Sequence, residues 1–326
     1  ALDAAGRRAN CRLPIVIDGL NESEDPRRWK QLLAPLHHLM AEYSYALVVC
    51  TLRPLFKEET LPQDTLYLEI PDFEHHTVDA IHSYFRYYRI NPADAMLPLY
   101  LLRHPLTLRI FCEVTNPKRE HIVGLEAMPG SLTTLFERYL TQVASRVAEL
   151  SSRDQRYYQA DVLTALNKIG YALWESKERS IEQDKLRQLL RDDSHPWDKS
   201  IVYALEQGGI LIRTPIREQV SIGYAISYDA LAGHIVADAL IRQLQIKGFT
   251  LADWLTEKQT VATLSGKIDE RFTLATDTFQ ALVGLIPQRL HGQQLWPLLD
   301  GQLQIEALYE ATKLDSAYID GETVEK

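Results

Sequence analysis

The chain has 326 residues, of which 46% are apolar and 24% charged, and its formal net charge at pH 7 is −9. This composition is typical of a soluble globular protein of two or three domains, and the negative charge argues against a general nucleic-acid binder. No apolar run is long enough to predict a membrane span and no signal peptide begins the chain, so we expect a cytoplasmic protein without a membrane partner. Its three cysteines are too few and too scattered to predict a disulfide framework.

The chain begins without methionine and with a helical pattern already under way, LDAAGRRA. We therefore expect a fragment of a longer protein. The next stretch, residues 13–22, reads LPIVIDGLNE, an apolar run followed by an acidic cluster. A continuous apolar run predicts a parallel strand covered on both faces, with Asp18 at its carboxyl end, where open α/β sheets bind ligands. This is the pattern of a Walker B element, in which an aspartate holds Mg²⁺ beside an acid that orients water. The alternative is a buried strand that ends in an ordinary turn.

A second strand is predicted over residues 45–50 (YALVVC). The helix before it contains Pro35, which should kink that helix. One long crossover between two strands predicts a parallel pair, which places Thr51 and Arg53 at the same sheet edge as Asp18. An arginine there could contact a γ-phosphate, although a surface arginine before a proline is the simpler interpretation. A third short strand is predicted over residues 65–70.

No phosphate-binding loop of the form G-x-x-x-x-G-K-[ST] occurs in the chain. Gly266 and Lys267 are adjacent, but residue 268 is isoleucine, so the motif fails. A Walker B strand cannot hold a nucleotide well without its partner loop. Either that loop lies upstream of residue 1, or the Walker B interpretation is wrong.

The middle of the chain is predicted to be helical. Thr77 can cap a helix with an apolar face that runs to Tyr88, and Pro105 suits the first position of a helix that continues to Thr115. A proline-started helix in a small lid often lies against a nucleotide base. The simpler interpretation of His104-Pro105 is an ordinary helix start.

A winged-helix pattern follows over residues 131–226. Ser131 caps a long amphipathic helix, three more helical segments come after it, and two strands lie near residues 210–212 and 220–226. The helix that would enter a DNA groove has no basic surplus, and Arg213 and Arg217 are too few to reverse this. We therefore expect a regulatory or protein-binding role for this pattern rather than DNA binding.

Tyr228 and Asp229 open the next helix, where polar residues either cap the helix or contact a phosphate. Beyond it, residues 276–287, 293–300 and 302–313 read as short paired helices that could begin a helical-repeat array.

Taken in order, these pieces resemble the STAND class of P-loop NTPases, of the NACHT or NB-ARC kind, and most of all the bacterial antiviral STAND (Avs) proteins. The likeness covers most of residues 1–245. It is carried by four stretches, which are LPIVIDGLNE, VVCTLRP, HPLTLRIFCEVTN and YAISYDALAGHIVADAL. The order of the pieces is more specific than any one motif.

The resemblance implies a site for ATP or ADP with Mg²⁺. Asp18 would hold the metal, and Glu22 would be the acid near the hydrolytic water. Arg53 would be the sensor-1 arginine, with Thr51 beside it on the strand end. His104 and Pro105 would contact the nucleotide, Pro105 at the adenine.

Two positions depart from the family pattern. Tyr228 and Asp229 stand where many relatives carry a His-Asp pair that locks the ADP state, so tyrosine replaces histidine there. Asn21 stands where relatives often carry an acid, which leaves Glu22 to act alone.

The expected fold class is α/β plus all-α. We expect four domains: a partial parallel P-loop NTPase sheet (1–75), a helical lid (76–130), a winged helix (131–246) and a linker or first helical repeats (247–326). The class implies a switch that forms a homo-oligomer with ATP, senses a phage protein through C-terminal repeats and activates an N-terminal effector outside this chain. The fragment alone should be inactive as an ATPase. The alternatives are a catalytically inactive binding scaffold and a winged-helix transcription regulator.

Overall fold

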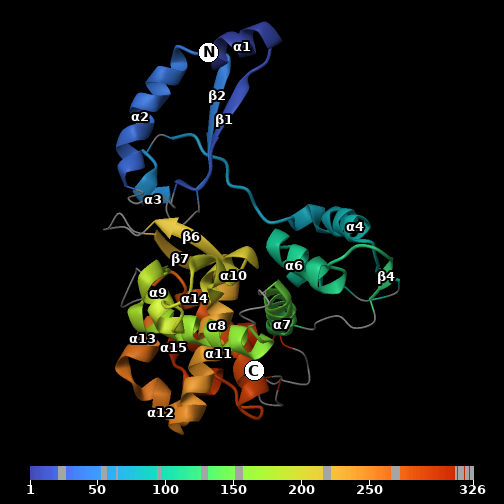
Figure 1. Ribbon diagram of the computed structural model, residues 1–326, viewed down its shortest axis with the longest axis vertical. Coiled ribbons are helices and arrows are strands. Elements are labelled where there is room, and N and C mark those ends of the chain that lie inside the picture. Colours follow the sequence, from blue (N-terminus) through green and yellow to red (C-terminus); the bar gives the residue numbers. More distant parts are fainter. Residues whose placement is uncertain are drawn as a thin grey trace. The chain divides into compact units, whose positions relative to one another are not determined.

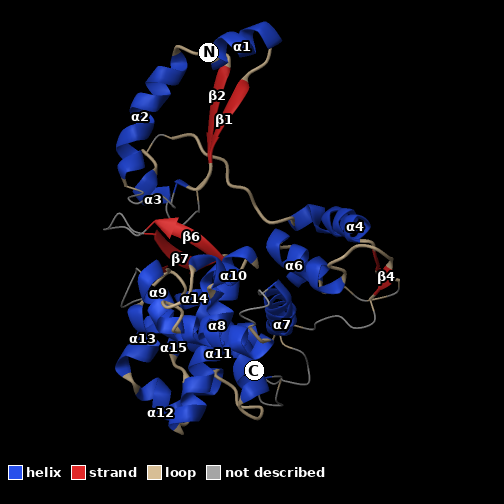
Figure 2. Cartoon of the chain, in the orientation of Figure 1, coloured by secondary structure: helices blue, strands red, loops and turns tan. Residues whose placement is uncertain are grey.

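The computed structural model describes residues 1–20, 27–52, 57–63, 65–93, 95, 97–125, 131–150, 157–215, 222–265, 272–312, 314, 319 and 323. Asn21, Glu22 and Arg53 lie outside these residues. The chain divides into two compact units, which we describe separately (Figures 1 and 2). Unit 1 comprises Ala1–Pro71 and Thr214–Gly223, and unit 2 comprises Asp72–Arg213 and Tyr224–Lys326.

Unit 1 is built around two parallel strands that pair residue by residue, with Ile15 opposite Val48. Its elements are α1 (Leu2–Ala9), β1 (Leu13–Ile17), α2 (Arg28–Ala41), β2 (Ala46–Cys50) and α3 (Lys57–Thr60). The predicted parallel pair with a helical crossover is confirmed, and α2 runs through Pro35. A parallel pair needs such a crossover because its strands run in the same direction.

One face of this sheet is open in the structure. The apolar run predicted a strand covered on both faces, yet Val16 is 63% exposed and its neighbours on β2, Leu47 and Val49, are 42% and 41% exposed. The predicted third strand over residues 65–70 is wrong, because these residues form an extended segment without strand pairing. Leu66, at 94% exposed, contacts almost nothing.

Unit 2 begins with a helical segment. Its elements are η3 (Glu74–His76), α4 (Thr77–Tyr88), β3 (Ile90–Asn91), α5 (Leu99–Leu102), α6 (Pro105–Thr115) and β4 (Val123–Gly124). The extent of α4 and the start of α6 at Pro105 agree with the sequence prediction, but Thr77 does not cap α4: the N-cap is His76 and Thr77 is the first helical residue. Helices α4 and α6 share an apolar core, in which the rings of Phe85 and Phe111 stack 5.9 Å apart.

The next segment alternates helices with a small sheet and belongs to unit 2 except for Thr214–Gly223. Its elements are α7 (Leu132–Leu150), α8 (Gln159–Ser176), β5 (Ile181–Glu182), α9 (Gln183–Leu190), η4 (Trp197–Lys199), α10 (Ile201–Gln207), β6 (Leu211–Pro215) and β7 (Ile222–Ile226). The three strands have the order β5-β7-β6. Figure 2 shows β6 and β7 beside one another in red. The helices and the two longer strands predicted here are confirmed.

The last segment is helical. Its elements are α11 (Asp229–Lys247), α12 (Leu251–Thr256), α13 (Lys258–Leu264), α14 (Ala275–Arg289), η5 (Trp296–Leu298) and α15 (Gly301–Ala311). The predicted helix over residues 293–300 is wrong, because only the 3-10 turn η5 forms there and Leu299 after it is extended. Helix α11 is buried against both α8 and α14. None of the described helices combines the length and hydropathy that crossing a membrane requires.

Candidate functional site

The carboxyl ends of β1 and β2 bring Asp18 and Thr51 together. The Thr51 hydroxyl donates a hydrogen bond to Asp18 Oδ1 and accepts one from the Gly19 N–H at 2.7 Å. The backbone closes the same corner, because the Thr51 N–H donates to Ile17 O at 3.0 Å and the Leu20 N–H donates to Thr51 O at 2.9 Å. The sequence prediction that Thr51 lies at the same edge as Asp18 is therefore met by the structure.

The local sequence explains this corner. Gly19 has a φ of 67°, in the left-handed region that glycine adopts readily, so the chain can turn directly after Asp18. Leu20 then returns to the interior, where it is 1% exposed. Asp18 and Thr51 themselves are exposed. The turn thus presents a carboxylate to solvent while a hydroxyl fixes its orientation.

The chemistry available at this corner is that of an oriented oxygen ligand. Mg²⁺ is commonly held through one or two carboxylates, with substrate phosphates and water completing its shell, and Asp18 fits such a role. Within the described ranges, no group of three or more His, Cys, Asp or Glu side chains could hold a metal ion.

His104 and Pro105 form the start of α6 in unit 2. His104 is the extended N-cap residue, and its carbonyl oxygen accepts from the Leu108 N–H at 3.0 Å. Burial lowers the pKa of His104, Asp72 opposes this shift, and Arg103 adds to it. Arg103 and Asp72 form an ion pair of 2.8 Å. These contacts hold the beginning of α6 in place.

Tyr228 and Asp229 lie at the start of α11, and the aspartate already has a partner. Arg179 Nε donates to Asp229 Oδ1 at 2.6 Å, and Arg179 Nη2 donates to Ile226 O at 2.6 Å. Sequence reasoning missed Arg179. The signal that could have found it is the strand order, since Arg179 lies two residues before β5, which pairs with β7, and Asp229 lies three residues after β7.

Tyr228 belongs to the same part of unit 2 as α6. The pKa of Arg109 on α6 is raised first by the hydrogen bond and charge of Glu113 and, further down, by Tyr228. Tyr228 is therefore within electrostatic range of a residue one helical turn beyond Pro105. The structure thus brings Asp18 and Thr51 together in unit 1, whereas His104-Pro105 and Tyr228-Asp229 lie at the starts of two different helices of unit 2.

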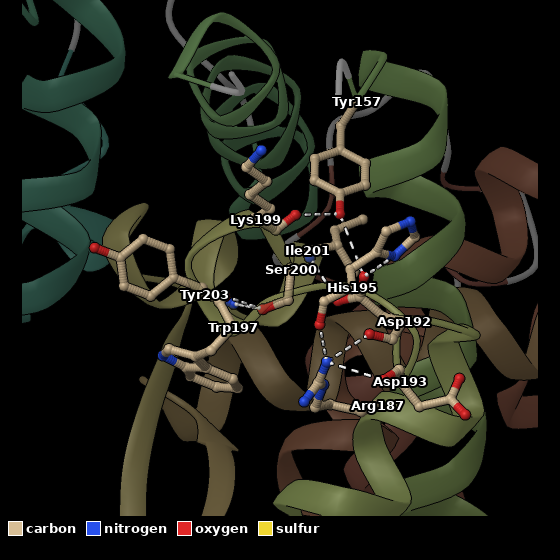
Figure 3. Close-up of polar contacts among 10 residues, drawn as sticks. All are labelled: Tyr157, Arg187, Asp192, Asp193, His195, Trp197, Lys199, Ser200, Ile201 and Tyr203. Carbon is tan, nitrogen blue, oxygen red and sulfur yellow. Dashed lines mark hydrogen bonds and ion pairs between the residues drawn. The ribbon is translucent and has the colours of Figure 1, made fainter. Parts of the chain in front are cut away.

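A second polar cluster surrounds the buried carboxylate of Asp192 in the segment between α9 and α10 (Figure 3). Asp192 Oδ2 accepts from the Ile201 N–H at 2.7 Å, and Oδ1 lies 3.0 Å from His195 Nδ1. The Tyr157 hydroxyl contacts Oδ1 at 3.3 Å and donates to Lys199 O at 2.8 Å. These bonds fix the segment that leads into α10.

Arg187 and Ser200 complete this cluster. Arg187 Nη2 donates to the carbonyl oxygens of Asp192, Asp193 and His195, at 2.8 Å for Asp192. The Ser200 hydroxyl donates to Trp197 O at 2.7 Å and accepts from the Tyr203 N–H at 3.0 Å, so it caps α10. Its proton is directed to a backbone carbonyl rather than to His195, which is not the arrangement of an activated serine nucleophile. The cluster is structural.

The sequence matches no protein-family model and no curated protein.

Proposed function

We propose that this chain is part of an ATP-dependent signalling switch of the STAND class that binds ATP or ADP with Mg²⁺. The observation that carries the proposal is the Asp18–Thr51 contact at the carboxyl ends of two parallel strands, which is where α/β sheets bind ligands. Asp18 would hold the metal. The bound cation would neutralise charge on the nucleotide phosphates.

Thr51 has a positioning role in this proposal. Because its hydroxyl contacts both Asp18 and the Gly19 N–H, it fixes the carboxylate before any cation arrives. Glu22 is proposed as the acid that orients water and Arg53 as the residue that senses the γ-phosphate, with Asn21 beside them. These three roles rest on the sequence motif.

Two features of the fold support the proposal. One is the order helix, strand, two helices and two strands, with the sheet order β5-β7-β6, which is the order expected of the winged-helix domain that we propose follows the lid. The exposed apolar side chains of β1 and β2 are unusual for a parallel sheet, which is normally covered on both faces. The crossover helices of a larger parallel sheet would cover them.

The proposed lid contacts are His104 and Pro105, and the proposed lock is Tyr228 with Asp229. Since Arg179 holds Asp229 in the structure, Asp229 would act through its position at the winged helix rather than by direct phosphate contact. The proposed partners are further copies of the protein, a phage protein as trigger and an N-terminal effector, in the cytoplasm. The residues after α11 would begin the sensor.

The test is nucleotide analysis of the natural protein that contains this chain. After purification and denaturation, ADP or ATP is quantified by ion-exchange chromatography, and we expect close to one nucleotide per chain. Asp18→Asn should reduce Mg²⁺-dependent retention, whereas the matched control Glu69→Gln, an exposed acid of unit 1, should not. Absence of nucleotide, or equal retention in both variants, would favour the inactive scaffold instead.

Hydrolysis and assembly are tested separately in the same protein. Glu22→Gln should retain ATP but slow its turnover by orders of magnitude, because a general base contributes about 10²–10⁴-fold. Arg53→Ala should bind ATP without assembling, as measured by mass photometry. Unchanged turnover in the first variant, or normal oligomers in the second, would remove that residue from its role.

A further inference from the structure

A small polar cavity lies in unit 2 where the ends of α4 and α6 meet the middle of α7. Its volume is about 130 Å³, and its polar lining consists of Tyr88, Glu113, Arg119, Tyr139, Gln142 and Arg146. None of these residues belongs to the proposed nucleotide site. Genuinely empty cavities are apolar, so a polar cavity lined by two arginines holds water or a polar ligand.

The charges around the cavity leave an excess of positive charge. Glu113 is the acidic lining residue, and Arg109 pairs with it at 2.8 Å from the same helix. Arg119 and Arg146 have no carboxylate partner in the part of the chain that the structure describes. Arg119 is half-buried and Arg146 is exposed. The planar fork of a guanidinium group suits the oxygens of carboxylates and phosphates.

Both arginines are held in place. The Arg119 guanidinium lies 4.6 Å from the ring centroid of Tyr87 and 5.0 Å from that of Tyr88, within cation–π range. Arg146 Nη2 donates to Gly208 O at 3.1 Å, which anchors its side chain where α7 meets the end of α10. These contacts restrict the two guanidinium groups before a ligand arrives, which lowers the entropy cost of binding.

The remaining lining groups add neutral donors. Burial, followed by the charge of Glu113, raises the pKa of Tyr139 to about 12 and also raises the pKa of Tyr88, so both hydroxyls carry their hydrogen at neutral pH. The side-chain amide of Gln142 supplies two further N–H groups. Two guanidinium groups, two hydroxyls and one amide offer more donors than the two oxygens of a carboxylate can accept. A phosphate group, with three strong acceptor oxygens, suits this set better.

The geometry points to an oxyanion-binding site in this cavity that takes inorganic phosphate or a small phosphate monoester. Its volume sets an upper limit on the ligand, since an apolar cavity of about 150 Å³ holds a benzene-sized molecule. A nucleotide is far larger than this cavity, and the proposed ATP-site residues are absent from its lining. A bound phosphate would connect α7 to the segment that follows α6 and would stabilise unit 2 by mass action.

The test uses isothermal titration calorimetry with inorganic phosphate, at constant ionic strength adjusted with chloride. We expect one phosphate per chain, and Arg119→Gln and Arg146→Gln should each weaken binding at least roughly tenfold, because each removes a charged donor. Lys118→Gln is the matched control: it removes the same charge from the neighbouring, exposed position and should change the Kd by less than about twofold.

Tyr139→Phe keeps the proposal testable if an arginine variant fails to fold. It removes only the hydroxyl group and should weaken binding by roughly threefold to tenfold, because it removes one neutral hydrogen bond. Three results would overturn the proposal: no binding to the unmodified protein, equal weakening by Lys118→Gln, or displacement of phosphate by one equivalent of ATP. Displacement by ATP would place the phosphate in a nucleotide site. If the protein bound phosphate but no nucleotide, the proposed function would fail and the phosphate site would stand.

Discussion

Arg179 Nε donates to Asp229 Oδ1 at 2.6 Å and so ties the segment before β5 to the first residue of α11. The two side chains are 22% and 30% exposed, and the same guanidinium also donates to Ile226 O at the end of β7. Asp229 therefore stabilises the junction between the small sheet and the long helix α11, whatever other role it has.

Arg179→Met should lower the free energy of unfolding by about 1–2 kcal/mol, because a charged hydrogen bond is lost at a partly solvated position. Urea unfolding of the nucleotide-free protein measures this directly. Glu175→Gln, an exposed substitution in the last turn of α8, should change stability by less than about 0.5 kcal/mol. If Arg179→Met lowered nucleotide retention without any loss of stability, Asp229 would have a ligand role instead.

Asp192→Asn tests whether the cluster in Figure 3 is structural. The asparagine would keep one oxygen but would direct an NH₂ group toward donors such as the Ile201 N–H, so we expect a loss of about 2–4 kcal/mol in unfolding free energy. The neighbouring Asp193 is exposed, and Asp193→Asn should have almost no effect. Equal unfolding midpoints for the two variants would contradict the interpretation.

Gly233→Ala tests the close approach of α11 and α14. A Cβ atom at Gly233 would lie 2.7 Å from the carbonyl oxygen of Asp277, a backbone atom that cannot rotate away. We expect a loss of about 1–3 kcal/mol, the usual range for overpacking. Gly124→Ala is the control, since nothing lies within 4 Å of the added carbon there. A stable Gly233→Ala protein with an unchanged unfolding midpoint would show that these helices can separate without cost.

Local patterns predicted much of the fold. Helical spacing and a proline at the first position were sufficient for α4 and α6, because these helices bury one face and begin with a residue suited to that end. The parallel pairing of β1 and β2 followed from one long crossover. The strand predicted over residues 65–70 failed because an apolar pattern does not supply a pairing partner, and residues such as Leu68 are left 89% exposed.

The polar contacts could not be predicted in the same way. Arg179 and Asp229 are separated by 50 positions and meet only because of the strand order. The cavity near Tyr139 depends on how α4, α6 and α7 pack, which no single segment encodes. By contrast, Asp18 and Thr51 each follow a predicted strand directly, so their meeting could be derived from the sequence.

His234 should make the protein sensitive to acid. It lies on α11, is 2% exposed and packs edge-on against Phe136, and its Nδ1 has no hydrogen-bond partner among the described residues. Burial lowers its pKa to about 4, Asp238 opposes the shift and Arg289 adds to it. Asp238 and Arg289 pair with each other at 3.5 Å, and their effects on the pKa of His234 have opposite signs. Desolvation is therefore the main cause of the lowered pKa.

The sign of the effect follows from proton linkage. Above about pH 6.5 the imidazole is neutral in both the folded and the unfolded state and contributes nothing to the pH dependence. Between about pH 6.5 and pH 4 the unfolded chain binds a proton that the folded protein excludes, so stability falls as the pH falls, by up to about 3 kcal/mol.

The variant His234→Leu tests this effect, because it removes the imidazole and retains most of the side-chain volume. The measurement is urea unfolding at intervals from pH 7.5 to pH 4.5, and the difference between variant and unmodified protein should grow toward acid. The exposed His82→Gln serves as control and should follow the unmodified protein. Parallel curves for His234→Leu and the unmodified protein would contradict the prediction, because they would mean that His234 has the same pKa in the folded and the unfolded state.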